Sequence, residues 1–110
     1  MALRQVSLAT AKFRPSGAQD LNLVRFSYVN VDHESRSIDA HYKVGRLLGG
    51  AFVPSPDSVC CGHVFVSGDA FAEYLAEGAG SAGQDEAQQD WLLQRAIDSD
   101  ATLAGTKGDY

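Results

Sequence analysis

The chain has 110 residues, of which 45% are apolar, and its 9 basic and 14 acidic side chains give a net charge of −5. This length fits one domain with a single modest core. No window approaches the roughly 18 uncharged apolar residues of a membrane-crossing helix, and the first eleven residues lack the apolar run of a secretory signal. We therefore expect a protein with no membrane partner that is not secreted by a signal peptide and is cytoplasmic or assembled in a virus particle.

The charges are divided unevenly along the chain. Residues 1–54 hold seven basic and four acidic groups, a net charge of +3, whereas residues 55–110 hold two basic and ten acidic groups, a net charge of −8. Direct binding of nucleic acid generally needs a basic surface, which an acidic chain argues against. The division suits charges that neutralise one another within the chain, or molecules that meet basic end to acidic end. A solvated acidic surface that maintains solubility explains it equally well.

The first half of the chain has β-type patterns. Residues 5–13 alternate loosely, and residues 21–31 are apolar on both faces. Residues 37–44 show the clearest alternation with a period of two, which predicts a strand with one buried face. The expected core face carries Ile38, Ala40, Tyr42 and Val44, and the opposite face carries Ser37, Asp39, His41 and Lys43. We expect 21–31 and 37–44 to form a hairpin.

Residues 45–57 are expected to form a connection, because glycines and prolines interrupt them. Apolar residues between these breakers, among them Leu47, Leu48 and Phe52, are unusual for a loop. Such a loop either folds over the core or docks on another molecule. Residues 58–67 resume the β pattern.

The second half of the chain has α-type patterns. Asp69 is placed to cap a helix over 69–77, and a second helix is expected over 85–98, after a glycine-rich linker at 78–83. The predicted fold class is α+β: an antiparallel sheet of three to four strands (5–13, 21–31, 37–44 and 58–67) with two C-terminal helices packed on one face.

The C-terminal segment 99–110 contains few apolar residues. It has too little apolar surface to offset the entropy of ordering its backbone. We therefore expect a single domain over 1–98, followed by an extended arm over 99–110 that a partner orders and that the fold does not need.

The sequence Cys60-Cys61-Gly62-His63 offers the most suggestive chemistry. On a strand, Cys61 and His63 share a face about 6–7 Å apart, but a structural zinc site needs four ligands. A disulfide between adjacent cysteines would be strained and would close almost no loop. We expect two structural thiols, with no metal, no cofactor and no catalytic residue. A small metal- or thiol-dependent enzyme around Cys61 and His63 remains a further hypothesis.

Five residues are candidates for protein–protein contacts: Leu47, Leu48, Phe52, Trp91 and Tyr110. Trp91 either anchors an interface, as tryptophans at binding hot spots do, or seals its helix onto the sheet.

The function expected from these features is that of a non-enzymatic structural subunit of a larger assembly. Its partners are other protein subunits or copies of itself, and a small accessory protein of a virus capsid, tail or baseplate fits best. The alternative is an acidic inhibitor that mimics nucleic-acid phosphates and occupies a groove of a host enzyme. The acids available for such mimicry are Asp85, Glu86, Asp90 and Asp98.

Overall fold

The computed structural model describes residues 3–14, 16–55, 61–77 and 85–110, which form one antiparallel sheet and two α-helices. The strands are β1 (Arg4–Phe13), β2 (Gln19–Asp32), β3 (Ser37–Leu48), β4 (Ala51–Pro54), β5 (Cys61–Ser67) and β6 (Gly105–Asp109). The helices are α1 (Asp69–Glu77), α2 (Asp85–Ser99) and a short 3-10 turn, η2 (Ala101–Leu103). The predicted α+β class is confirmed, but the sheet has six strands rather than three to four.

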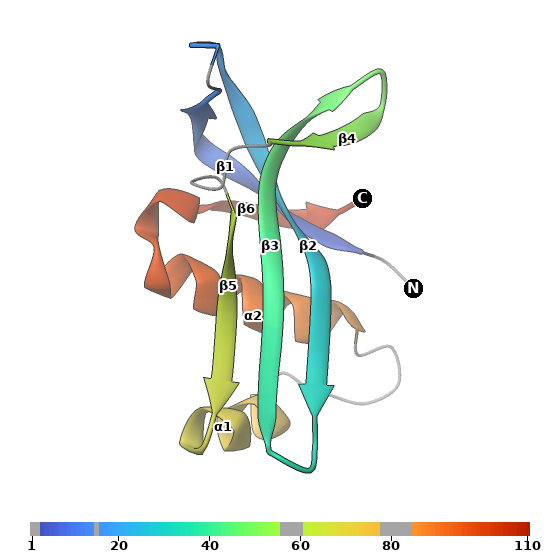
Figure 1. Ribbon diagram of the computed structural model, residues 1–110, viewed down its shortest axis with the longest axis vertical. Helices are drawn as coiled ribbons and strands as arrows, with labels where there is room; N and C mark the ends of the chain where they lie inside the picture. The colour runs from blue at the N-terminus through green and yellow to red at the C-terminus, as the bar shows by residue number, and fades with distance from the viewer. Residues whose placement is uncertain (1–2, 15, 56–60, 78–84) are drawn as a thin grey trace.

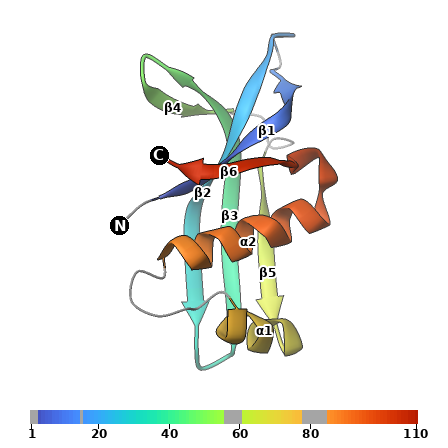
Figure 2. The ribbon, with the colours of Figure 1, turned by 180° about the vertical axis from the view of Figure 1, so that it is seen from behind.

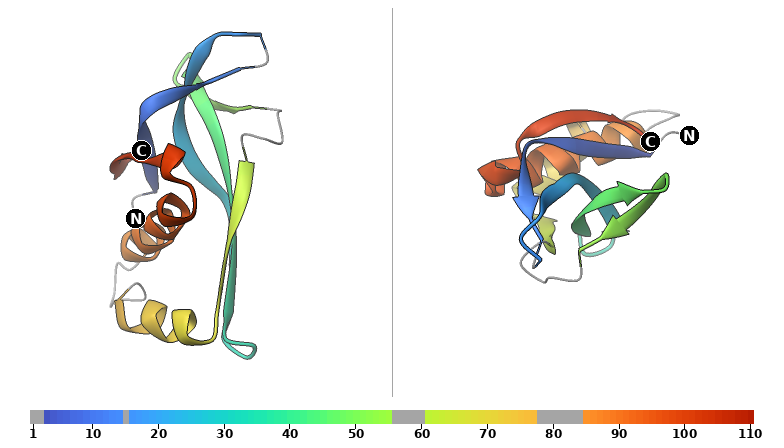
Figure 3. Two further views of the ribbon diagram at one scale, coloured as in Figure 1. Left: turned by 90° about the vertical axis from the view of Figure 1, so that its left-hand side faces the viewer. Right: turned by 90° about the horizontal axis from the view of Figure 1, so that it is seen from above.

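The strands follow the spatial order β4-β3-β2-β1-β6, and β5 pairs with β3 (Figure 1). On the edge of β3 away from β2, β5 pairs along 37–43 and β4 pairs along 45–48. Both helices lie on one face of the sheet (Figure 3), and α2 runs across the strands (Figure 2). We call the opposite face the open face. Neither described helix is long and apolar enough to cross a membrane.

The core lies between the helices and the alternating side chains of the strands. Ile38, Ala40 and Val44 are buried, as their period of two predicts. Tyr42 lies on the same face but is half-buried, at the margin of the core. A Cβ at Gly62 would fall 2.5 Å from the Tyr42 hydroxyl oxygen. The strand opposite Tyr42 therefore needs glycine at this position, because the aromatic ring occupies the space of a side chain.

The expected connection over 45–57 is wrong for most of its length. β3 continues to Leu48 and turns back into β4, which pairs with it residue for residue. Gly49 and Gly50 have φ values of 60° and 82°, a backbone conformation that a two-residue hairpin turn requires and that glycine adopts most readily. The two glycines thus make a turn between strands rather than ending the β-structure. Residues 56–60 and 78–84, which include Cys60 and the expected linker, lie outside the described residues.

The C-terminal segment pairs with and packs on its own chain, where the sequence predicted an extended arm; its ordering by a partner stays a prediction. Leu103 is 1% exposed and belongs to the hydrophobic core. β6 pairs antiparallel with β1, and the Tyr110 amide donates to the Leu3 carbonyl oxygen at 3.0 Å. A Cβ at Gly105 would collide with the Ser7 backbone. Glycine at this position therefore allows β6 to approach β1 closely. The low apolar content of residues 99–110 did not predict this pairing.

This pairing gives a direct prediction for truncation. Deleting residues 105–110 should lower the free energy of unfolding by about 2–4 kcal/mol, because several inter-strand hydrogen bonds of about 1 kcal/mol each are lost. Urea unfolding of the purified protein measures the change. Thr106→Ala, an exposed substitution in the same strand, is the control and should change stability by less than about 0.5 kcal/mol. An unchanged stability of the truncated chain would restore the arm hypothesis.

Candidate functional site

Two positive side chains lie directly opposite each other on the open face. The β2–β3 register pairs Arg25 with Lys43, while the flanking Tyr42 and Val44 face the core. Like charges directly opposite on one face of a sheet destabilise the pair of strands. Among the described residues, no carboxylate lies within 4.0 Å of either group. The pair is therefore a local cost to the fold that an external anion would relieve.

The guanidinium of Arg25 is held in a fixed orientation. Its Nε donates to Gln5 Oε1 at 2.9 Å. Its Cζ lies 3.6 Å from the ring centroid of Tyr110 and 4.7 Å from that of Phe52. Within the described part of the chain, the hydrogen bonds of this group use only Nε. The two terminal nitrogens are left for a ligand, and they have the geometry that binds a carboxylate or phosphate in a bidentate manner.

The surface beside Arg25 is hollowed. One hollow of about 240 Å³ has Arg25, Lys43, Phe52 and Tyr110 in its lining. A second hollow of about 510 Å³ lies along β3 and β5, and both hollows are lined by Ser27 and Lys43. Ser27 stands at the irregularity between the paired residues Phe26 and Tyr28 of β2. The two hollows form one groove across the open face, since they share these residues.

Aromatic rings line the second hollow. The register places His41 opposite both Tyr28 and His63. The rings of His41 and His63 stack with centroids 5.6 Å apart, and the Tyr28 ring meets His41 edge-on at 5.5 Å. Asp39 Oδ2 lies 3.2 Å from His41 Nε2. This strip continues the groove with flat side chains that suit stacking and apolar contact.

The sequence motif around Cys61 falls on the same face. Cys61 and His63 both lie on the open face of β5, as expected, and His41 stands opposite His63. Among the described residues, no three His, Cys, Asp or Glu side chains are grouped so that they could hold a metal ion. Of the motif, the described residues Cys61 and His63 offer a thiol and an imidazole ring beside that of His41, and Cys60 lies outside the described residues.

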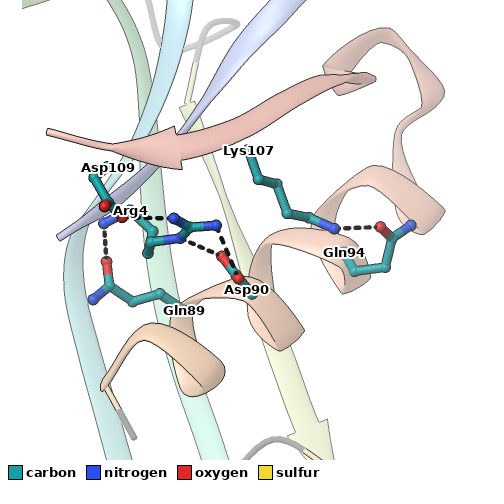
Figure 4. A network of polar contacts seen from close by, with 6 residues as sticks. All are labelled: Arg4, Gln89, Asp90, Gln94, Lys107 and Asp109. Atoms are coloured by element: carbon teal, nitrogen blue, oxygen red, sulfur yellow. Dashed lines mark hydrogen bonds and ion pairs between the residues drawn. The ribbon is translucent and has the colours of Figure 1, made fainter. Parts of the chain in front are cut away.

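Tyr110 reaches Arg25 because a polar network fixes the C-terminal strand (Figure 4). Arg4 Nε and Nη2 donate to the two Asp90 carboxylate oxygens at 2.8 and 3.1 Å, and Nη1 donates to Asp109 Oδ1 at 2.6 Å. The Arg4 amide donates to Gln89 Oε1 at 2.8 Å. One arginine thus joins β1, β6 and α2, and the position of the terminal tyrosine follows from it.

Four side chains have shifted pKa values with identifiable causes. Hydrogen bonds to Asp90 and Asp109 raise the pKa of Arg4, and burial raises the pKa of Tyr42. The Ser35 backbone amide and hydroxyl lower the pKa of Asp32 in the β2–β3 turn. The side chain of Thr102 lowers the pKa of Asp100, with further contributions from the Thr102 amide and from Lys12. The shifts of Arg4, Asp32 and Asp100 stabilise the charged forms of these groups in the network and the turns, whereas that of Tyr42 stabilises its neutral form at the margin of the core.

The five residues predicted for protein–protein contacts do not lie on one surface. Phe52 and Tyr110 meet at Arg25, and Leu47 is the direct partner of Phe52 across β3 and β4. Leu48 is exposed beside the hairpin turn. Trp91 is half-buried on the helical side, where its ring lies 5.4 Å from that of Tyr74 and its Nε1 donates to Glu77 at 3.3 Å. Trp91 thus contacts the other helix, α1, rather than sealing α2 onto the sheet as one alternative expected, and its role as an interface anchor stays a prediction.

The residues of the groove that sequence reasoning did not select are Arg25, Lys43, Tyr28 and His41; His63 was selected only with Cys61, as part of a metal or thiol site. The alternation of 37–44 had already placed His41 and Lys43 on the face away from the core. The missing information was the register, because only cross-strand pairing shows that Arg25 and Tyr28 stand beside them.

No protein-family model, no curated protein and no solved structure matches this chain.

The network around Arg4 predicts a specific loss of stability. Arg4→Lys keeps the charge but cannot make the two-pronged contact with Asp90 while also reaching Asp109. The free energy of unfolding should fall by about 1–3 kcal/mol, the range for hydrogen bonds to charged groups. Arg36→Lys, on an exposed turn, is the matched control and should change stability by less than about 0.5 kcal/mol. Equal effects of the two substitutions in urea unfolding would contradict the proposed importance of the network.

The lowered pKa of Asp100 predicts a dependence of stability on pH. Its folded-state pKa lies below the ordinary value of 3.8. Its stabilisation is therefore complete above that value and is lost as the pH falls through the folded-state pKa. Asp100→Asn should show a smaller decrease in stability between pH 5 and pH 2.5 than the wild-type chain, measured by urea unfolding at each pH. Identical pH profiles for the two proteins would show that Asp100 contributes nothing to acid sensitivity.

Proposed function

We propose that this chain is a non-enzymatic interaction subunit of a larger protein assembly and that the open face is its binding surface. The observation that supports this function is the opposed pair Arg25 and Lys43, which lacks an anion in the described chain and stands among exposed aromatic rings. Arginine, tyrosine and phenylalanine are enriched in the cores of protein interfaces. Tyrosine and arginine are also over-represented among the residues that contribute most to binding.

The exposed apolar area of this face supports the same function. Tyr28 is 50% exposed, Phe65 is 60% exposed and Tyr110 is 44% exposed. A single exposed apolar residue on a monomer needs no explanation, whereas a row of them beside unpaired charges indicates a contact surface.

Within such an assembly, we place the chain among small accessory subunits of a virus capsid, tail or baseplate. The support is the charge split along a short chain together with the exposed hairpin that carries Leu47 and Leu48. Repeated subunits use complementary charge to fix which surfaces meet.

The alternative, an acidic mimic of nucleic acid, has less support. Several carboxylates of the second half are paired with cations of the chain itself. Asp90 and Asp109 bind Arg4, and Asp100 lies 3.9 Å from Lys12. A mimic needs a line of carboxylates free to face an enzyme, and of the four acids available for mimicry Asp90 is already bound to Arg4.

The proposed function predicts the mass of the native complex. In an extract of its source cells, the chain should sediment in a complex whose mass is well above the 11.7 kDa of a single chain. The variant Arg25→Gln/Lys43→Gln, with a melting temperature no lower than that of the wild-type chain, should be found mostly as free chain, because it lacks the two groups that bind an anion. Lys107→Gln, on the helical side of β6 where Lys107 contacts Gln94, is the matched control. A chain that sediments as a monomer in the extract, or a double variant that stays in the complex, would contradict the proposal.

A further inference from the structure

The chain itself carries an acidic surface that could occupy the groove. On α1, Asp69, Glu73 and Glu77 recur every fourth residue and therefore lie on one side of the helix. All three are exposed, as are Ala72 and Ala76 between them. The opposite side of α1 carries Phe71 and Tyr74, which are buried in the core. We call the exposed side the acidic stripe; its small alanines allow another surface to come close.

The acidic stripe is only weakly neutralised by its neighbours. α1 contains no basic residue, and Glu77 lies in the last turn, where the helix dipole disfavours negative charge. Arg95 Nη1 lies 3.9 Å from Glu73 Oε2, and Trp91 Nε1 donates to Glu77 at 3.3 Å. Because a carboxylate accepts several hydrogen bonds, both glutamates keep capacity for a further cation. The stripe and the groove thus carry matching, unsatisfied charges.

The spacings of the two surfaces also match. Carboxylates four residues apart on a helix are separated by about 6 Å. Side chains directly opposite on adjacent strands start from Cβ atoms about 4.5–5.5 Å apart. Glu73 and Glu77 could therefore contact Arg25 and Lys43 at the same time, one carboxylate on each cation. The bidentate geometry of Arg25 is available for this contact because its terminal nitrogens have no other partner among the described residues.

We propose that the groove binds the acidic stripe of a second copy of this chain. This inference rests on the proposed function and names the partner. α1 lies at one end of the longest dimension, on the helical side of the sheet (Figure 1, Figure 3). Arg25 and Lys43 are paired across β2 and β3 on the open face. A chain cannot place its own stripe in its own groove. The contact joins different surfaces of two copies and is repeated head to tail, which produces a closed ring or an open filament.

Two neutral variants separate the surfaces. The groove variant, Arg25→Gln/Lys43→Gln, keeps the stripe, and the stripe variant, Glu73→Gln/Glu77→Gln, keeps the groove. The wild-type purified chain should grow beyond a dimer with increasing concentration in light scattering. Each variant alone should associate at least about tenfold more weakly, since it loses two charge-assisted contacts. An equimolar mixture should form a one-to-one dimer and grow no further. The intact groove of the stripe variant binds the intact stripe of the groove variant, and no second pair of intact surfaces is left.

The mixture is also the control for folding, since the dimer forms only if both variants keep their native surfaces. A wild-type chain that stays monomeric at all concentrations would overturn the second copy as the partner. If the native complex still loses the chain on Arg25→Gln/Lys43→Gln, the proposed function stands and its partner is a different protein. A single-stranded oligonucleotide that binds the wild-type chain and not the groove variant would assign the groove to phosphates and overturn this proposal.

Discussion

The ladder between β2 and β3 is the constraint on which the rest of the molecule depends. It fixes which side chains face the helices, because a shift of one residue would exchange the two faces of both strands. With this register Ile38 and Ala40 are buried, and Arg25 stands opposite Lys43. The core and the groove are thus two results of one pairing. The irregularity at Ser27 lets the ladder bend while both ends keep their alternation.

Closure of the sheet at its other edge depends on contacts that are distant in sequence. β6 pairs with β1 across about the whole length of the chain, and it is stabilised by Arg4, which contacts α2 as well. A strand of five residues with two glycines has little intrinsic preference for β-structure. Its order therefore comes from the ladder, from the carboxylate contacts and from Leu103, which is buried just before it. These contacts place the C-terminal residue on the open face.

Local patterns predicted the parts of the fold that local interactions decide. The strand over 37–44 and the helix over 69–77 were predicted from the sequence. In the strand a period of two marks the buried face, and in the helix an apolar stripe marks it. The β4 hairpin was missed because Gly49 and Gly50 were interpreted as breakers, although two glycines between apolar residues are also a hairpin turn. β6 could not be predicted in this way, since its partner strand begins about a hundred residues earlier.

The candidate site was out of reach of the sequence for a related reason. Phe52 was selected as an apolar residue of an expected loop and Tyr110 as the end of an expected arm, and the fold brings them together at Arg25, which no local pattern marks. Composition was misleading here, because an overall charge of −5 says nothing about two cations on one patch. Electrostatic binding is decided by the local arrangement of charges rather than by their sum.

The charge split along the sequence is resolved in two ways by the fold. On the helical side, the cations of β1 are used within the chain, where Arg4 and Lys12 meet carboxylates of the second half. On the open face, Arg25 and Lys43 have no such partner in the described residues, and the stripe on α1 lies at one end of the molecule, on the helical side of the sheet. Internal pairing could have placed these charges together at little cost, yet each surface keeps an excess of one sign. An arrangement of this kind stabilises contacts between molecules more than it stabilises the isolated chain.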